Sequence, residues 1–453
     1  MAHLLPPPIR PGRPARRARV PLLVALAAAL AGCPAAGDDV RPPSTQFYYP
    51  TALAASPDGA ALFVVNANAD LLYNTGSVVV VDLVAVDALV ADPAAGGCAP
   101  AYEQPAVREC DEAGVITGSR GVRIGNFASA AAVQALADGA LRLFVTVRGD
   151  PSVTWIDYRD GELSCAGGEE IPLCDDDNRV TRFRDDPDLP PLTAEPFGIY
   201  VDSDNHYAVV THLIEAAISL IHTPEDGPPV LADKLNGVFT PNGNVQSALG
   251  VAGRRGAGDS DLVYVTSRSD TRVQTLYVEP NVAGSLPRFA LGDYFFLDSV
   301  SPNGDLRDVR GISFNADGTR AYIVNRSPPM LHVIDTATGA DGTPTNEVVA
   351  NVEMCRDAAN VVVTDPGQGE RAYVSCFPAG QVWVVDPDLG TVEDIITVGS
   401  GPHSMTLDPS RKRLYVGNYL DDTVAVVDID PTSATGNQVV LRLGSPKQRG
   451  EEY

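Results

Sequence analysis

The stretch GPHSMTLDPSRKRLYVGNYLDDTVAVVDID, Gly401 to Asp430, contains three short runs of apolar and β-branched residues separated by turn-forming sequences. Such runs predict β-strands, and the Asp, Asn, Gly and Pro residues between them predict tight turns. Three strands on their own do not bury a core. The stretch therefore predicts a small antiparallel sheet that needs partners from elsewhere in the chain.

Relatives of this stretch recur along the chain. Three close copies, each with an apolar strand, a turn, a second strand and a β-branched strand, are Tyr49–Leu83, Val309–Gly339 and Ala358–Gly390. Three weaker copies end at Tyr158, His222 and Val278. Together with the opening stretch they predict seven small sheets packed radially around one axis, because this arrangement buries both faces of every sheet.

The ends of the predicted second strands, YVGN, FVVN, YIVN and YVSC, resemble the YVTN-type β-propeller repeat. The resemblance implies an all-β fold over residues 47–453, a seven-bladed β-propeller of four-stranded antiparallel blades. For ring closure, we expect Val439–Leu443 to be the outer strand of the last blade. Thr45–Tyr49 is expected to pair either with that strand or with the first blade. Such families include surface-layer proteins, exported proteins and lactonase-like enzymes, so the fold alone does not separate binding from chemistry.

The first residues have the pattern of an export signal. Residues 1–32 contain five arginines and no acidic residue, and the apolar run Val20–Ala31 is too short to cross a bilayer. The sequence LAGC, Leu30 to Cys33, resembles the lipobox of bacterial lipoproteins. This resemblance implies a lipoprotein signal peptide at 1–32 and lipid attachment at Cys33. Residues 33–46 then form a flexible tether, and Pro34 after the cysteine favours the outer membrane of the cell envelope.

The composition excludes one class of partner. The chain has a formal net charge of −25 at pH 7, and 44% of its residues are hydrophobic. Nucleic-acid binding depends on clustered Lys and Arg that neutralise phosphates. We therefore expect a folded, acidic protein that does not bind nucleic acid.

The six cysteines after Cys33 favour disulfides in an exported chain, although six cysteines allow fifteen pairings. Pairing neighbours along the chain gives Cys98–Cys110, Cys165–Cys174 and Cys355–Cys376. No C-x-x-C spacing supports zinc or covalent haem. The insertions 84–120 and 158–178 follow third strands and are expected on the face opposite the blade entries. These insertions form either an interaction surface or simply long loops that disulfides stabilise.

Motifs for known chemistry are few. The sequence has no Gly-rich phosphate loop, no Gly-x-Ser-x-Gly and no His-Glu-x-x-His. The acidic run Cys174–Asn178, near Glu169 and Glu170, offers the oxygen ligands that calcium prefers but lacks the spacing of a dedicated calcium loop. The sequence therefore assigns no catalytic residue, no metal site and no cofactor.

One set of positions is a candidate binding site. The residue after the entry proline begins the innermost strand of a blade, close to the mouth of the central channel. By alignment of the repeats these residues are Thr51, Phe197, Arg310, Asn360 and His403. A hydroxyl, an aromatic ring, a guanidinium, an amide and an imidazole suit a small polar or anionic ligand.

Two functions follow as expectations. The first is an exported, lipid-anchored binding or scaffold module whose partner is an envelope protein or a polysaccharide. The alternative is a lactonase-like hydrolase of a small polar substrate at the central channel. In the alternative, Arg310 and His403 would polarise a carbonyl group or activate water.

Overall fold

The computed structural model describes residues 39–102, 104–116, 121–165, 171–183, 188–204, 206–239, 247–254, 262–268, 270–279, 285–297 and 308–446. The chain divides into two units, residues 1–40 and residues 41–453, and the second contains the whole β-fold. The predicted signal peptide, residues 1–32, and the predicted lipid-attachment residue Cys33 lie outside the described residues. Within the described ranges, no helix is long and apolar enough to cross a membrane.

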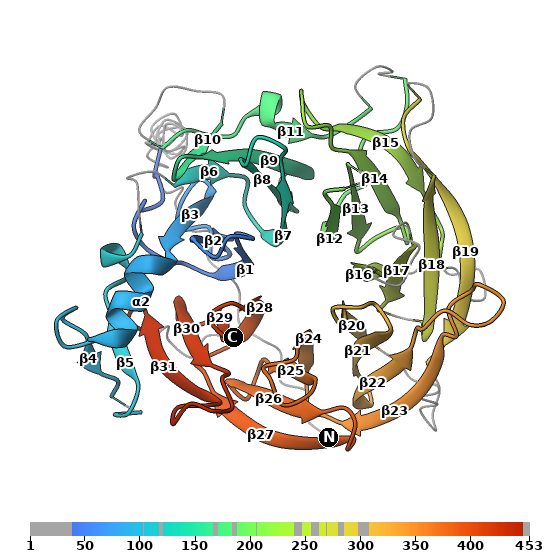
Figure 1. Cartoon of the computed structure of the whole chain (residues 1–453). Coiled ribbons are helices and arrows are strands. Elements are labelled where there is room, and N and C mark those ends of the chain that lie inside the picture. Colours follow the sequence, from blue (N-terminus) through green and yellow to red (C-terminus); the bar gives the residue numbers. More distant parts are fainter. Residues whose placement is uncertain are drawn as a thin grey trace, which may run out of the picture. The chain divides into compact units, whose positions relative to one another are not determined.

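Seven antiparallel sheets surround a common axis, which confirms the predicted seven-bladed β-propeller (Figure 1). Blade 1 consists of β1 (Pro50–Ala55), β2 (Ala61–Asn66), β3 (Gly76–Asp82) and β6 (Val122–Ile124). Blade 2 consists of β7 (Ala128–Ala135), β8 (Leu141–Val147), β9 (Ser152–Arg159) and β10 (Glu162–Ser164), and β11 (Arg179–Val180) also pairs with β9. Blade 3 consists of β12 (Pro196–Asp202), β13 (Tyr207–His212), β14 (Ile218–His222) and β15 (Val230–Leu235).

The other blades follow the same order from the axis outwards. Blade 4 consists of β16 (Ala248–Gly253), β17 (Leu262–Ser267), β18 (Arg272–Glu279) and β19 (Arg288–Phe296). Blade 5 consists of β20 (Val309–Phe314), β21 (Arg320–Arg326), β22 (Pro329–Asp335) and β23 (Glu347–Glu353). Blade 6 consists of β24 (Ala358–Thr364), β25 (Arg371–Cys376), β26 (Gln381–Asp386) and β27 (Thr391–Thr397). Blade 7 consists of β28 (Pro402–Asp408), β29 (Arg413–Asn418), β30 (Thr423–Asp428) and β31 (Gln438–Leu443).

The hydrophobic core is divided among the seven interfaces between neighbouring blades, each filled by its own apolar cluster. Second strands contribute one aromatic side chain in six of the blades, at equivalent positions of the ladder: Phe63, Phe144, Tyr264, Tyr322, Tyr373 and Tyr415. Each of these six side chains is at most 1% exposed. Because both faces of a blade are buried, its middle strands are apolar at almost every position.

A tight turn joins the first two strands of a blade. In blade 1 the N–H of Gly59 donates to the carbonyl oxygen of Ser56 at 2.9 Å, and Gly59 has a φ of +69°. This left-handed conformation favours glycine. Gly318 occupies the matching turn of blade 5 with a φ of +68°, so the Asp-Gly pairs of the repeat mark these turns.

Each innermost strand carries a β-bulge next to its first residue. In blade 1 the register shifts between Pro50 and Ala52, and the other six blades show the same irregularity. A bulge inserts one extra residue and redirects nearby side chains. The residues at the seven bulges meet around the axis, where they line a cavity.

Ring closure differs from the prediction in one respect. β31 is the outer strand of blade 7, as expected, but Thr45–Tyr49 forms no strand, so the predicted pairing of this segment is wrong. The segment is held by side chains instead. Phe47 is buried in the cluster between blades 7 and 1, and the N–H of Tyr49 donates to Asp422 Oδ1 at 2.6 Å.

The edge of blade 7 is covered by the insertion of blade 1. The strand β5 (Arg108–Cys110) pairs in parallel with β31, and β4 (Ala99–Pro100) pairs with β5. The helix α2 (Leu83–Ala91) precedes them, and its Asp87 forms ion pairs with Arg411 at 2.8 Å and with Arg413. The expectation that this insertion lies only on one face is therefore wrong: an open sheet edge needs a partner, and the insertion supplies it.

The three predicted disulfides are confirmed. Their Cα–Cα distances are 4.3 Å for Cys98–Cys110, 5.1 Å for Cys165–Cys174 and 5.9 Å for Cys355–Cys376. The first holds the strand that covers blade 7. The second joins Cys165, directly after β10, to Cys174, which precedes the short 3-10 helix η2 (Asp176–Asn178). Another 3-10 helix, η1 (Glu112–Gly114), lies in the first insertion. The third connects the end of blade 5 to the second strand of blade 6.

Candidate functional site

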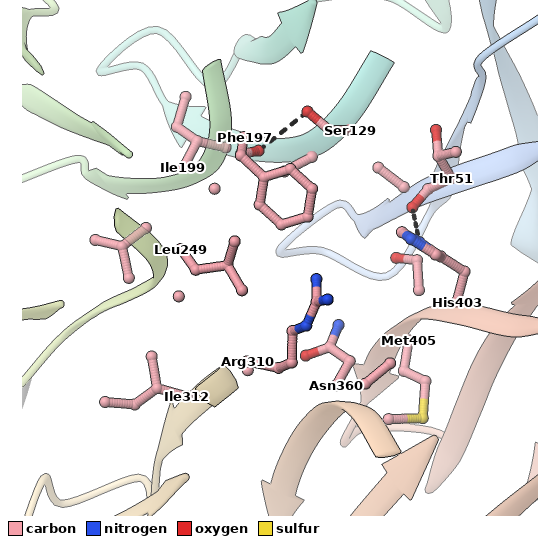
Figure 2. A pocket seen from close by; sticks show the side chains of 18 of the residues that line it. Thr51, Ser129, Phe197, Ile199, Leu249, Arg310, Ile312, Asn360, His403 and Met405 are labelled. Atoms are coloured by element: carbon pink, nitrogen blue, oxygen red, sulfur yellow. Dashed lines mark hydrogen bonds between the residues drawn. The ribbon is translucent and has the colours of Figure 1, made fainter. Parts of the chain in front are cut away.

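A cavity of about 250 Å³ lies at the centre of the ring, at the starts of the innermost strands (Figure 2). All five residues predicted for the channel mouth line it: Thr51 on β1, Phe197 on β12, Arg310 on β20, Asn360 on β24 and His403 on β28. The structure therefore brings together side chains that are up to 352 positions apart in the chain, as for Thr51 and His403. Their role in binding a ligand stays a prediction.

Two further cavity residues were not predicted from the sequence, and one predicted residue is out of alignment. Ser129 and Leu249 occupy the equivalent positions of blades 2 and 4 and also line the cavity. Their strands begin with alanine, so the entry proline that marks other blades is missing. Asn360 stands one residue beyond the equivalent position, since Ala358 pairs with Cys376 as Pro50 pairs with Asn66. Counting back from the end of the second strand would not have found them, because Ser129 lies 18 residues before Val147 whereas Thr51 lies 15 residues before Asn66.

Threonine hydroxyls hold the ring of site residues together. Thr211 Oγ1 accepts a hydrogen bond from the N–H of Gly198 at 3.0 Å and donates to the carbonyl oxygen of Leu249, in the next blade, at 2.6 Å. The same arrangement recurs in blades 2 and 4, where the hydroxyls donate to the next blade: Thr146 to Phe197 at 2.8 Å and Thr266 to Arg310 at 3.0 Å. These hydroxyls fix the backbone of three cavity residues.

Three arginines and one carboxylate form a cationic cluster beside the cavity. Asp308 Oδ2 accepts a hydrogen bond from Arg310 at 2.6 Å and lies 3.6 Å from Arg326 Nη1. Arg268 Nε lies 3.7 Å from the other carboxylate oxygen. Three positive charges therefore face one negative charge. Burial lowers the pKa of Arg326, and the neighbouring charge of Arg310 lowers it further.

Arg310 and Arg326 are themselves part of the cavity lining, and no Asp or Glu belongs to the lining among the described residues. Figure 2 shows the guanidinium of Arg310 pointing into the cavity beside the amide of Asn360. The buried Nε of Arg310 has no hydrogen-bond partner. Asn360 Oδ1 accepts from the N–H of Val361 at 2.8 Å. The cavity thus presents donors to a ligand.

His403 is held in one tautomer by the first blade. Its Nδ1 lies 2.9 Å from the carbonyl oxygen of Thr51, and because a carbonyl only accepts, Nδ1 carries the proton. Burial lowers the pKa of His403, and the charges of Arg326 and Arg310 lower it further. The imidazole is therefore neutral at pH 7, with Nε2 as the atom that can accept a proton. Its ring packs against Tyr419, with 5.8 Å between ring centroids.

The other described histidines lie away from the cavity. His212 is inside blade 3 with Nε2 2.9 Å from Ser219 Oγ, and burial lowers its pKa to about 4. His222 Nδ1 donates to the carbonyl oxygen of His206 at 3.1 Å. His332 is fully buried in blade 5. These residues take part in blade packing.

The acidic loop after β10 shows local structure. Asp175 caps η2 by accepting a hydrogen bond from the N–H of Asp177 at 3.1 Å. Glu169 and Glu170 lie outside the described residues. Among the residues that the structure does describe, no group of three or more His, Cys, Asp or Glu side chains is arranged to hold a metal ion.

The fold and the cavity define the chain as a seven-bladed β-propeller with a cationic central site. No family model and no curated protein match the sequence. A putative 6-phosphogluconolactonase from Bacteroides fragilis is similar in structure, with a TM-score of 0.55, 15% identity, and coverage of 84% of this chain and 94% of that chain. Another putative 6-phosphogluconolactonase, from Bacteroides uniformis, has a TM-score of 0.52, 14% identity, and coverage of 78% and 87%. The hydrazine synthase of Kuenenia stuttgartiensis gives 0.53, 15%, and coverage of 87% and 98%. At these identities the likeness shows the fold alone.

Proposed function

We propose that the chain binds a small organic acid in its central cavity and hydrolyses the corresponding lactone there. The observation that carries the proposal is that one cavity is lined by two cationic side chains, Arg310 and Arg326, and by the neutral imidazole of His403. The names of the two Bacteroides propellers, both putative 6-phosphogluconolactonases, support a lactone as the substrate.

The charge distribution supports an anion at this place. The chain as a whole has a formal net charge of −25, yet the three arginines at the cavity outnumber the two carboxylates that act on them, Asp308 and Asp357. Charge inside a narrow, partly desolvated site acts more strongly than charge on the surface. A carboxylate therefore gains most of its attraction from Arg310 and Arg326.

The hydrolysis needs a base for water and a partner for the developing oxyanion. Water attacks the lactone carbonyl carbon, and His403 Nε2 takes the proton that water loses. Arg310 donates to the oxyanion of the tetrahedral intermediate. The bond from the acyl carbon to the ring oxygen then breaks, and the imidazolium returns the proton to that oxygen. The product is a hydroxy acid whose carboxylate remains beside the arginines.

The experiment measures hydrolysis of δ-hexanolactone in a pH-stat at pH 7, after subtraction of the spontaneous rate. We expect His403→Gln to lower kcat/KM by about 100-fold or more, while the matched control His222→Gln, also a half-buried histidine bonded to a carbonyl, keeps the wild-type rate. No hydrolysis by the wild type, or an equal loss in both variants, would contradict the proposal.

The alternative of a scaffold for an envelope protein or a polysaccharide has less support. It depends on the disulfide-bonded insertions 84–120 and 158–178 as an interaction surface, and part of the first insertion covers the edge of blade 7. A protein or polysaccharide partner bound through these insertions, with no hydrolysis of the lactone in the experiment above, would favour the scaffold.

We also propose that the chain is exported and anchored through a lipid on Cys33 to the outer membrane. Three disulfides support an oxidising compartment. Cys33→Ala should move the protein from the membrane fraction to the soluble fraction and abolish fatty-acid labelling. Retention of both properties would contradict the lipid anchor.

A further inference from the structure

The polar groups that a ligand can reach lie on one side of the cavity. Arg310 and Arg326 come from blade 5, Asn360 from blade 6 and His403 from blade 7. Met405 is on the same side but is only 5% exposed, so it offers little apolar surface.

The other side of the cavity is apolar. Phe197 and Ile199 come from blade 3, Leu249 and Val251 from blade 4, and Ile312 lies next to them in blade 5. Figure 2 shows Phe197, Ile199, Leu249 and Ile312 along one wall, across the cavity from Asn360 and His403. This wall has side chains that cannot form hydrogen bonds.

Two of the three hydroxyl groups that line the cavity are directed at backbone carbonyl oxygens, and the third, Ser404 Oγ in blade 7, accepts a hydrogen bond from the N–H of Leu53 at 2.9 Å. Ser129 Oγ lies 3.0 Å from the carbonyl oxygen of Pro196 and 3.2 Å from that of Phe197 (Figure 2). Thr51 Oγ1 donates to the carbonyl oxygen of Val65 at 3.4 Å. Neither hydroxyl group is therefore free to donate to a ligand. A ligand hydroxyl on the apolar side would lose its hydrogen bonds to water and find no side-chain hydroxyl to replace them.

This distribution selects among organic acids and lactones. A hydroxyl buried without a partner loses its hydrogen bonds to water, whereas a methylene group gains by leaving water. A ligand that is hydroxylated along its length would therefore bind poorly against Phe197 and Ile199. A ligand with one polar end and a hydrocarbon body matches both sides of the cavity.

We infer that the ligand of the central cavity is amphipathic: a short alkyl or aryl acid, or its lactone, rather than a polyhydroxylated one. Its carboxylate or lactone carbonyl faces Arg310 and Asn360, and its hydrocarbon body contacts Phe197, Ile199 and Ile312. The inference rests on the proposed function and specifies its substrate class. The cavity volume of about 250 Å³ limits the ligand to a small molecule.

Two monocarboxylates with six carbons each separate the possibilities. Hexanoate has an unsubstituted chain, and gluconate carries a hydroxyl on every carbon other than the carboxylate. Isothermal titration calorimetry with both probes should show that hexanoate binds at least about tenfold more tightly. Phe197→Ser should weaken hexanoate about tenfold and leave gluconate unchanged, while Phe183→Ser, a half-buried phenylalanine outside the cavity, changes neither. If Phe197→Ser does not fold, Ile199→Asn tests the same wall.

The outcomes are distinguishable. Equal binding, or tighter binding of gluconate, with both ligands weakened by Arg310→Gln would overturn the amphipathic ligand and leave the proposed anion site intact. Binding of neither probe would overturn the proposed function, and the inference with it. Tighter hexanoate binding that is insensitive to Phe197→Ser and Ile199→Asn would place the hydrocarbon elsewhere and overturn the inference.

Discussion

Replacing Thr211 with valine tests whether the threonine hydroxyls hold the cavity together. Thr211 is fully buried, and valine keeps its shape but removes the hydroxyl. The N–H of Gly198 then loses its acceptor, and the carbonyl oxygen of Leu249 loses a donor at 2.6 Å. A buried polar group without a partner costs about 1–3 kcal/mol, and the added methyl group returns about 0.8 kcal/mol. Two such groups are left, so we expect Thr211→Val to lower the free energy of unfolding by about 1–5 kcal/mol.

The assay is equilibrium urea denaturation with the disulfides intact. Thr211→Ser is the matched control, because it keeps the hydroxyl and removes one methyl group, at a cost of about 1 kcal/mol. Stability should therefore fall in the order wild type, Thr211→Ser, Thr211→Val. A valine variant as stable as the wild type, or more stable than the serine variant, would refute the reasoning.

Two further predictions concern acid stability and the cover of blade 7. Because burial lowers the pKa of His212 to about 4 from an ordinary value of 6.5, the unfolded chain takes up this proton first, and the native state should lose about 3 kcal/mol as the pH falls from 6.5 to 4. His212→Gln should flatten the denaturation midpoint against pH over this range, and an unchanged slope would contradict the assignment. Replacing Cys98 and Cys110 with serine should lower the free energy of unfolding by about 3 kcal/mol, as expected for a loop closed over a separation of 12 residues. It should also increase hydrogen exchange in β31. Unchanged exchange there would show that the disulfide does not support the pairing of β5 with β31.

Local sequence was sufficient for the fold because each blade is a contiguous stretch with its own strands and turns. The second-strand aromatics and the Asp-Gly turn at Gly59 recur at regular places, so the number of blades could be counted. Ring closure could not be predicted in the same way. The parallel pairing of β5 with β31 joins Arg108 to Leu441, and no local pattern indicates such a distant partner.

The site was predictable where a residue type marks the strand entry, as Pro402 does for His403. Ser129 and Leu249 were missed because blades 2 and 4 are weaker copies of the repeat that also lack the entry proline, whereas Arg310, which follows Val309, lies in a close copy. The cationic cluster had no signal at all, since Arg268, Asp308 and Arg326 come from separate segments that blade packing brings together. The tautomer of His403 depends on the carbonyl oxygen of Thr51 in another blade, which only the closed ring supplies.

The pH dependence of kcat/KM for δ-hexanolactone is the most direct test of His403 as the catalytic base. His403 must be neutral to act as the base, and burial with the charges of Arg326 and Arg310 lowers its pKa. We expect kcat/KM to rise with pH through a single ionisation below pH 6.5, the ordinary histidine pKa. We also expect His403→Gln to remove this pH dependence. A rate that has no such ionisation, or keeps it in the variant, would contradict catalysis at this site.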